Sequence, residues 1–200
     1  MTQVEDGTGN SYKARVCDHN RLAVAGVARG YSAWKTLLGK THLVSTGFMP
    51  VTTTEGLMFW FQYTHESRHI TIDRVNMFWN GGNTNHNRAL KVLFDGGFTS
   101  VPTTNEQELT IYNANITSKL VLSADVYGWD GVGSGMTGQA GGGVLLSSNL
   151  VSQGATQWNV AGRLLLGPGS IIGILAQGEE AGNMAVTLCV TELDDEDMTP

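Results

Sequence analysis

The stretch Met184-Ala185-Val186-Thr187-Leu188-Cys189-Val190-Thr191-Glu192 has the clearest strand pattern in the chain. Its large apolar residues alternate with smaller or more polar ones, and they are Met184, Val186, Leu188 and Val190. Side chains of a β-strand point to opposite faces in turn, so this alternation places the four apolar residues on one face. The stretch therefore predicts a half-buried strand whose apolar face packs on a core.

Strand patterns recur outward from this stretch through most of the chain. The other predicted strands cover residues 57–65, 69–79, 90–95, 120–127, 144–150, 157–166 and 170–177. Turn-forming residues separate them, as at Gly81-Gly82-Asn83 and Gly167-Pro168-Gly169. About eight to ten short strands at close spacing predict an all-β fold, an antiparallel β-sandwich or jelly roll.

The predicted strand 69–79 contains a change of phase. Its apolar residues have opposite parity on either side of the centre, with Ile70 and Ile72 before it and Val75, Met77 and Trp79 after it. One extra residue in the strand would produce this shift and still keep both groups on one face. The sequence therefore predicts a β-bulge at Asp73-Arg74.

Two segments do not follow the strand pattern. Ser32–Leu38 is the one helix candidate, with Ser32 as its N-cap and Gly39 as its stop signal. Gly131–Gly143 holds seven glycines, which favours a loop on the surface of the sandwich. Close packing of backbones is the alternative interpretation of this glycine-rich segment.

Composition indicates a single folded domain. The chain has 200 residues and a mass of 21.4 kDa, and 41% of its residues are hydrophobic whereas 15% are charged. A chain of this size buries roughly 70% of the surface that it exposes when unfolded. The apolar runs are well short of the ~18 residues of a transmembrane helix, and the polar start does not resemble a signal peptide. We therefore expect no membrane contact.

Charge is distributed unevenly along the chain. Residues 10–40 carry six basic residues and one acidic residue, whereas residues 192–197 carry five acidic ones. Either these are two solvated surfaces, or the basic segment docks on an acidic partner. The basic residues are too sparse to indicate a nucleic-acid partner. The predicted organisation is an extended N-terminal arm at 1–28, a single jelly-roll domain at 29–193 and an acidic tail at 194–200.

His65-Glu66-Ser67-Arg68-His69 matches HExxH, the signature of zinc metalloproteases. That chemistry needs a helix, because only a helix puts both histidines on one face toward the metal. The flanking residues here are aromatic and β-branched, which favours strands and places the motif in a hairpin turn. A zinc hydrolase is therefore the weakest of the function hypotheses, and we expect no catalytic residue and no metal site.

Gly133-Ser134-Gly135-Met136-Thr137-Gly138 matches the dinucleotide-binding pattern GxGxxG. A dinucleotide site needs a strand before the glycines and a helix after them. Gln139-Ala140-Gly141 is a poor start for a helix, and a run so rich in glycine produces this match by chance. We therefore expect no nucleotide and no other cofactor.

The tryptophans and cysteines allow weaker predictions. Trp60 and Trp79 fall in apolar strands and are expected in the core, whereas Trp129 adjoins the glycine-rich segment. Trp129 is thus the candidate for an exposed aromatic contact with a partner. Cys17 and Cys189 are the only cysteines, and each takes the polar side of its strand's alternation. A disulfide between them is conceivable, but assembly in a cytoplasm favours free thiols.

The beginning of the chain carries a family resemblance. Residues 12–16 and 22–24 are predicted as two short strands, and Asp18-His19-Asn20 has turn chemistry. The segments Asp6-Gly7-Thr8-Gly9 and Asn20-Arg21-Leu22, with Val16 and Val24, resemble the N-terminus of tailed-bacteriophage virion proteins. In those proteins this pattern opens an arm that leads into a β-sandwich. The turn within Leu164–Ser170 is also similar to jelly rolls of virion decoration proteins.

The resemblance implies a capsid cement or decoration protein. Such a protein would bind the major capsid protein on the capsid exterior, after assembly in the host cytoplasm, and would form a homotrimer. Its arm would contact the shell, and the candidate contact residues are Tyr12, Lys13, Arg15 and Arg21. The alternative is a neck, head-fibre, tail or baseplate component, or a receptor-binding or glycan-binding virion protein.

Overall fold

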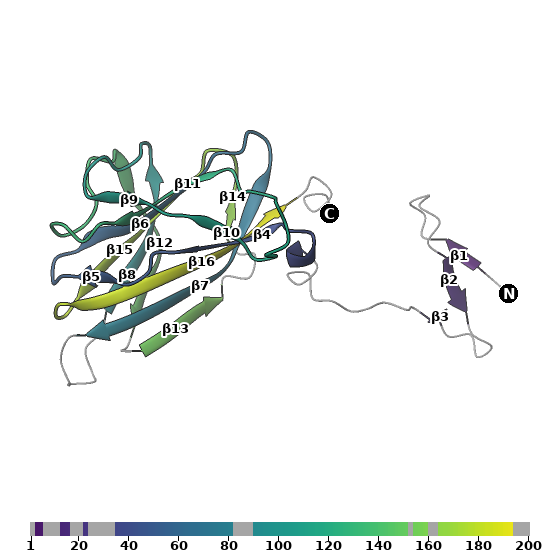
Figure 1. Cartoon of the computed structure of the whole chain (residues 1–200), viewed down its shortest axis with the longest axis horizontal. Coiled ribbons are helices and arrows are strands. Elements are labelled where there is room, and N and C mark those ends of the chain that lie inside the picture. Colours follow the sequence, from purple (N-terminus) through teal and green to yellow (C-terminus); the bar gives the residue numbers. More distant parts are fainter. Residues whose placement is uncertain are drawn as a thin grey trace. The chain divides into compact units, whose positions relative to one another are not determined.

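The chain divides into two units in the computed structural model, Met1–Tyr31 and Ser32–Pro200 (Figure 1). The structure describes residues 35–81, 90–151, 154–159 and 164–193, together with the backbone of three short strands in the first unit. The acidic tail at 194–200 lies outside the described residues. The domain boundaries 1–28, 29–193 and 194–200 stay predictions.

The first unit contains a small antiparallel sheet. Its strands are β1 (Gln3–Glu5), β2 (Lys13–Val16) and β3 (Leu22–Ala23), in the order β1-β2-β3. The register places Val4 opposite Ala14 and Arg15 opposite Ala23. The two predicted strands correspond to β2 and β3, whereas β1 was not expected. The pairing of β2 with β3 agrees with the two short strands and the turn that the sequence predicts, and β1 adds a third strand.

The second unit consists of two antiparallel sheets (Figure 1). Sheet I has the order β10-β4-β16-β7-β13. In addition, β14 pairs with β7, and β5 pairs with β16. Its strands are β4 (Thr41–Ser45), β5 (Met49–Val51), β7 (His69–Gly81), β10 (Ile111–Asn113), β13 (Gly154–Asn159), β14 (Leu165–Leu166) and β16 (Gly182–Leu193). Sheet II has the order β12-β8-β15-β6-β11-β9. Its strands are β6 (Gly56–Tyr63), β8 (Leu90–Phe98), β9 (Glu106–Glu108), β11 (Ala124–Trp129), β12 (Gly141–Val151) and β15 (Ile171–Gly178).

Eight of these strands have jelly-roll connectivity. In chain order they are β4, β6, β7, β8, β12, β13, β15 and β16. Sheet I places β4, β16, β7 and β13 side by side, which are the first, eighth, third and sixth of these strands. Sheet II places β6, β15, β8 and β12 side by side, which are the second, seventh, fourth and fifth. This alternation between two sheets is the double Greek key of a jelly roll. The predicted all-β sandwich is confirmed, and β10 and the pair β9 and β11 extend its sheets.

The core lies between the two sheets. Strand β16 contributes Met184, Val186, Leu188 and Val190, and all four are fully buried. Opposite them, sheet II contributes Phe59, Phe61, Ile172 and Ile174, whose exposed fractions are 1% or less. The half-buried strand predicted at 184–192 is confirmed. Each buried side chain of this size stabilises the fold by about 1.5–3 kcal/mol.

The predicted β-bulge in β7 is also present. Cys189 of β16 pairs with Arg74, and the next residue, Val190, pairs with Ile72, so Asp73 is the extra residue. Ile70 and Ile72 before the bulge, and Val75 and Trp79 after it, are at most 1% exposed. The bulge therefore keeps the whole of β7 in contact with the core.

A second buried layer covers part of the outer face of sheet II. Trp60 is fully buried, and its ring lies 5.7 Å from that of Tyr127. The glycine-rich segment contributes Met136, which is 2% exposed and donates its N–H to the carbonyl of Leu57 at 2.8 Å. A Cβ on Gly56 would collide with the carbonyl oxygen of Ser134. Gly135 and Met136 thus belong to a covering layer held by close backbone contact, whereas most of residues 131–140 are exposed, in agreement with the predicted surface loop.

Other predicted elements differ in extent. The helix is a single turn at residues 35–37, and Gly39 follows it with φ +72°, which confirms the stop signal. The predicted strand 57–65 ends at Tyr63, and the described part of 157–166 divides between β13 and β14. No helix among the described residues is long and apolar enough to cross a membrane.

Gly173 provides a test of the packing on sheet II. A Cβ at this position would lie 2.6 Å from the ring of Phe98 and 2.8 Å from Leu57, so Gly173→Ala is expected to destabilise the fold by about 1–3 kcal/mol. Urea unfolding measures this change. Gly96→Ala is the matched control, because its Cβ would meet only Leu146 at an ordinary 3.5 Å. Equal stability of the two variants would contradict the described packing.

Candidate functional site

The HExxH residues lie in a corner and not on a helix. Residues 64–68 connect β6 to β7 without a helix, and these strands belong to different sheets. The expected hairpin turn is therefore wrong, because the connection crosses from one sheet to the other. His65 Nδ1 accepts hydrogen bonds from the N–H groups of Ser67 at 3.2 Å and Arg68 at 3.1 Å. This histidine stabilises the corner through its ring nitrogen.

The remaining motif, GxGxxG, also lacks the setting that its chemistry needs. No group of three His, Cys, Asp or Glu side chains that could hold a metal occurs in the described part of the chain. The GxGxxG match at Gly133–Gly138 lies in turns, and strand β12 follows it where a dinucleotide site needs a helix. The arrangement therefore offers no phosphate-binding helix N-terminus at this segment.

A buried carboxylate joins the two sheets at one end of the sandwich. Glu192 of β16 is 7% exposed and accepts hydrogen bonds from the Tyr63 hydroxyl at 3.2 Å and from Arg68 Nη1 at 3.0 Å. Lys40 Nζ lies 3.7 Å from the same carboxylate. Burial, together with the charge and hydrogen bond of Glu192, raises the pKa of the Tyr63 phenol. Tyr63 therefore stays protonated and acts as a donor.

A hydroxyl network continues this cluster along sheet I. Thr191 donates to Asp73 Oδ2 at 2.5 Å, and Thr71 donates to Asp73 Oδ1 at 2.9 Å. The hydroxyls of Thr41 and Thr191 are 3.2 Å apart and both residues are buried. The bulge residue Asp73 is thus satisfied by two threonines. These contacts connect β16 to the bulge of β7 and to β4.

Cys189 is a buried free thiol, with an exposed fraction of 7%. Burial and, secondly, the charge of Asp73 raise its pKa, which lowers its reactivity as a nucleophile. The expected free thiol is confirmed at this position. Cys189 lies beside Asp73 and Arg74, in agreement with its predicted place on the polar side of the strand, but it is buried there. Cys17 lies outside the described residues.

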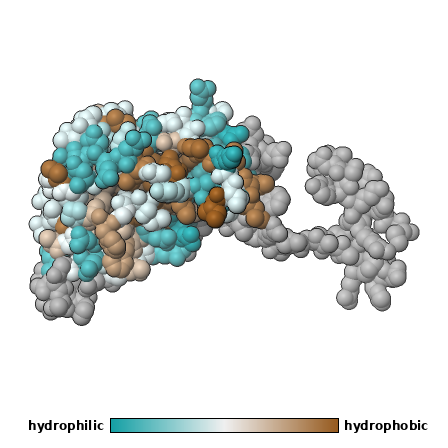
Figure 2. Space-filling view, viewed as in Figure 1, coloured by the Kyte–Doolittle hydropathy of each residue, from teal (hydrophilic) through white to brown (hydrophobic). Residues whose placement is uncertain are grey.

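Exposed apolar residues are the main candidates for partner contacts. Figure 2 shows apolar residues gathered over part of one face of the second unit. On edge strand β12, three consecutive residues are 43–59% exposed, and they are Val144, Leu145 and Leu146. Proteins normally protect a long apolar edge strand from pairing with another chain. We call these three residues the β12 stripe.

A second group of exposed apolar residues surrounds the helical turn. It comprises Leu37, Leu38, Ile116, Leu120 and Val121, with exposed fractions from 43% to 95%. The Asn115 amide donates to the carbonyl of Leu37 at 3.0 Å, which holds the two parts of the group together. We call this group the entry patch, because it follows the start of the second unit in the sequence.

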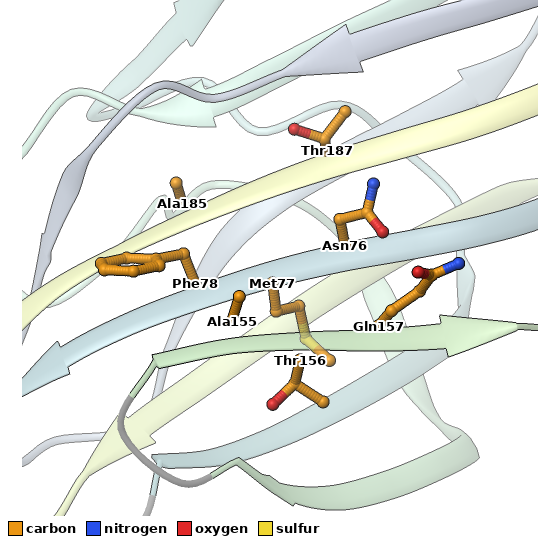
Figure 3. Close-up of a pocket in the computed structure, with 8 residues that line it drawn as sticks. All are labelled: Asn76, Met77, Phe78, Ala155, Thr156, Gln157, Ala185 and Thr187. Carbon is orange, nitrogen blue, oxygen red and sulfur yellow. The ribbon is translucent and has the colours of Figure 1, made fainter.

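A shallow depression of about 360 Å³ lies on the outer face of sheet I (Figure 3). Strands β7, β13 and β16 line it with Asn76, Met77, Phe78, Ala155, Thr156, Gln157, Ala185 and Thr187. Phe78 is 36% exposed, and its ring packs edge-on against Phe48, which is 71% exposed. This site was not predicted from the sequence, although Phe78 shares the parity of the outward residues Asn76 and Asn80, which was a usable signal.

Of the predicted contact residues, the structure describes the side chain of Trp129 and not those of the four arm residues. Trp129 is 4% exposed, and its Nε1–H donates to the carbonyl of Val132 at 2.6 Å. Its expected exposure is wrong, because the neighbouring turn folds back over the indole. Lys13 and Arg15 lie in β2, where only the backbone is described, and Tyr12 and Arg21 lie outside the described residues. The contact role of these four residues stays a prediction.

Comparison with known proteins gives no relative. No model of a protein family, no curated protein and no solved structure matches the chain. Function must therefore be argued from the surfaces described above.

The buried His42 predicts a loss of stability in acid. Burial, with Lys40 nearby and against the attraction of Glu192, lowers the pKa of His42 from its usual 6.5. Below pH 6.5 the histidine of the unfolded chain binds a proton, whereas the buried His42 of the folded protein stays neutral. The free energy of unfolding is therefore unaffected by this group above pH 6.5 and decreases as the pH falls below that value. Urea unfolding between about pH 7.5 and 5.5 measures this loss. His42→Gln removes the titrating group, and an equal acid loss in this variant would contradict the assignment.

Proposed function

We propose that this protein is a virion structural protein that cements the outer shell of a bacteriophage capsid by binding alone. The observation that carries the proposal is the exposed apolar surface of the jelly roll, at the β12 stripe and the entry patch. Monomeric proteins rarely leave contiguous apolar surface uncovered, so such surface marks contacts with other proteins. Jelly rolls are common in capsid proteins, and the opening segment supports the same assignment by resemblance.

The β12 stripe fits self-association into the proposed homotrimer. Strand β12 pairs with β8 on one side and forms the edge of sheet II. Its register shifts twice, between Gly141 and Val144 and between Leu145 and Ser147, which bends the edge out of a flat ladder. Side-chain packing of Val144, Leu145 and Leu146 is therefore favoured over a continued β-sheet between copies.

The entry patch and the arm fit the proposed shell contact. The patch begins at Leu37, six residues after the first unit ends at Tyr31. The preceding segment is the basic one, with Lys13 and Arg15 in β2. In this proposal the basic residues of the arm meet an acidic surface of the major capsid protein, and the entry patch separately buries apolar area against the shell.

Removal of the arm tests the shell contact. Deletion of residues 1–24 is expected to reduce binding to undecorated capsid shells at least tenfold, because the basic contact residues are lost. Co-sedimentation of the full-length and shortened proteins with purified shells measures the effect. Deletion of residues 194–200 is the control and is expected to leave binding unchanged.

Each outcome of that experiment distinguishes the virion hypotheses. Unchanged shell binding without the arm would refute the arm contact. If the full-length protein sediments with isolated tails but not with shells, the alternative of a neck, fibre, tail or baseplate component replaces the cement proposal. Binding to neither would refute both.

Substitution in the β12 stripe tests self-association. Leu145→Glu places a charge in the proposed interface and is expected to shift the solution mass from a trimer toward a monomer at micromolar concentration. Light scattering after gel filtration measures the mass. Val132→Glu is the matched control, because Val132 has a similar exposed fraction of 60% but lies in a turn. A monomeric wild-type protein would overturn the proposed trimer.

A further inference from the structure

The depression on sheet I combines an exposed aromatic ring with small neighbours. Phe78 lies in register between Ala185 of β16 and Ala155 of β13. The methyl groups of these alanines are too short to cover the ring, and all three residues are labelled in Figure 3. Phe48 supports the ring edge-on, with centroids 5.5 Å apart. Phe78 is 36% exposed, so part of its ring is open to solvent.

A row of amide and hydroxyl groups runs beside the ring. Asn76 lies in register between Thr187 and Gln157, two residues along β7 from Phe78. Side chains two residues apart on one face of a strand are about 7 Å from each other. The Asn76 amide lines the depression and carries both a donor and an acceptor.

The lining carries no formal charge. All eight lining residues are neutral at every ordinary pH, and apolar and polar side chains contribute together. A charged ligand would lose its hydration here without gaining an opposite charge. A neutral ligand with hydroxyl groups on its edge and an apolar face suits the site. Its hydroxyls can form hydrogen bonds with the row of polar side chains, and its apolar face can cover the Phe78 ring.

We propose that this depression binds a neutral carbohydrate, with one sugar ring stacked on Phe78 and its hydroxyls hydrogen-bonded to Asn76. A sugar ring has C–H groups on its faces and hydroxyls that both donate and accept, which matches the two rows of the site. The volume of about 360 Å³ lies at the lower end of small-molecule sites and suits a short stretch of a glycan. The site does not depend on the proposed shell binding, since it uses a different surface.

Titration of the full-length protein with neutral saccharides tests the site. The probes are disaccharides of glucose, galactose, mannose and N-acetylglucosamine, followed by isothermal calorimetry and by two-dimensional NMR. At least one of them is expected to bind with a Kd of about 1 mM or tighter. Phe78→Ala and Asn76→Ala are each expected to weaken binding about tenfold or more, because each removes one of the two recognition rows.

Tyr112→Ala is the matched control, because Tyr112 is an aromatic residue of sheet I that is 63% exposed and lies outside the depression. The Tyr112→Ala variant is expected to bind saccharides with the same Kd as the wild type. The site is refuted if none of the four disaccharides binds, or if Phe78→Ala binds as the wild type does. A change of solution mass in Phe78→Ala without saccharide binding would instead identify this face as a contact between copies of the chain.

Discussion

The bulge at Asp73 is the constraint on which the sandwich depends. Strand β7 is the longest in the protein and pairs with β16 along its whole length. Without an extra residue, one half of β7 would turn its apolar side chains toward solvent, because side chains alternate between faces. The bulge resets this alternation, and the same reset turns Asn76 and Phe78 to the outer face. Core packing and the saccharide site thus follow from one local irregularity.

The polar cluster around Glu192 solves a related problem at one end of the sandwich. The chain crosses between the sheets from Tyr63 to His69, and such a corner leaves polar groups near the core. Glu192 connects the sheets by accepting from Tyr63 in sheet II and from Arg68 in the corner itself. A buried carboxylate is tolerated only with such partners, since an unpaired one costs several kcal/mol. The HExxH pattern belongs to this corner.

Sequence periodicity predicted the elements that have one buried face. Strand β16 and the bulge in β7 follow from alternation alone, because burial of one face requires it. The three-residue strands β5 and β10 are too short to show a period, and they form only because longer strands offer them an edge. Trp129 was misjudged because its covering contact, the carbonyl of Val132, depends on a turn that composition does not specify.

The candidate site was the least accessible to sequence reasoning. Phe78 breaks the apolar alternation of β7, which was a usable signal that it points outward. The depression, however, also needs Ala155 and Ala185, which come from other parts of the chain and meet Phe78 only through strand pairing. Register between distant strands is a property of the fold and is not visible in any single stretch.

The position of β16 has a consequence for how the chain acquires its structure. This strand lies between β4 and β7 in sheet I, and its Thr191 contacts Thr41, 150 residues earlier. During synthesis, sheet I therefore stays split until the last strand leaves the ribosome, with the apolar faces of β4 and β7 uncovered. Contacts this distant in sequence also slow folding, because the entropy of closing a long loop is lost before they form. The newly made chain is thus most vulnerable to aggregation and proteolysis just before β16 inserts.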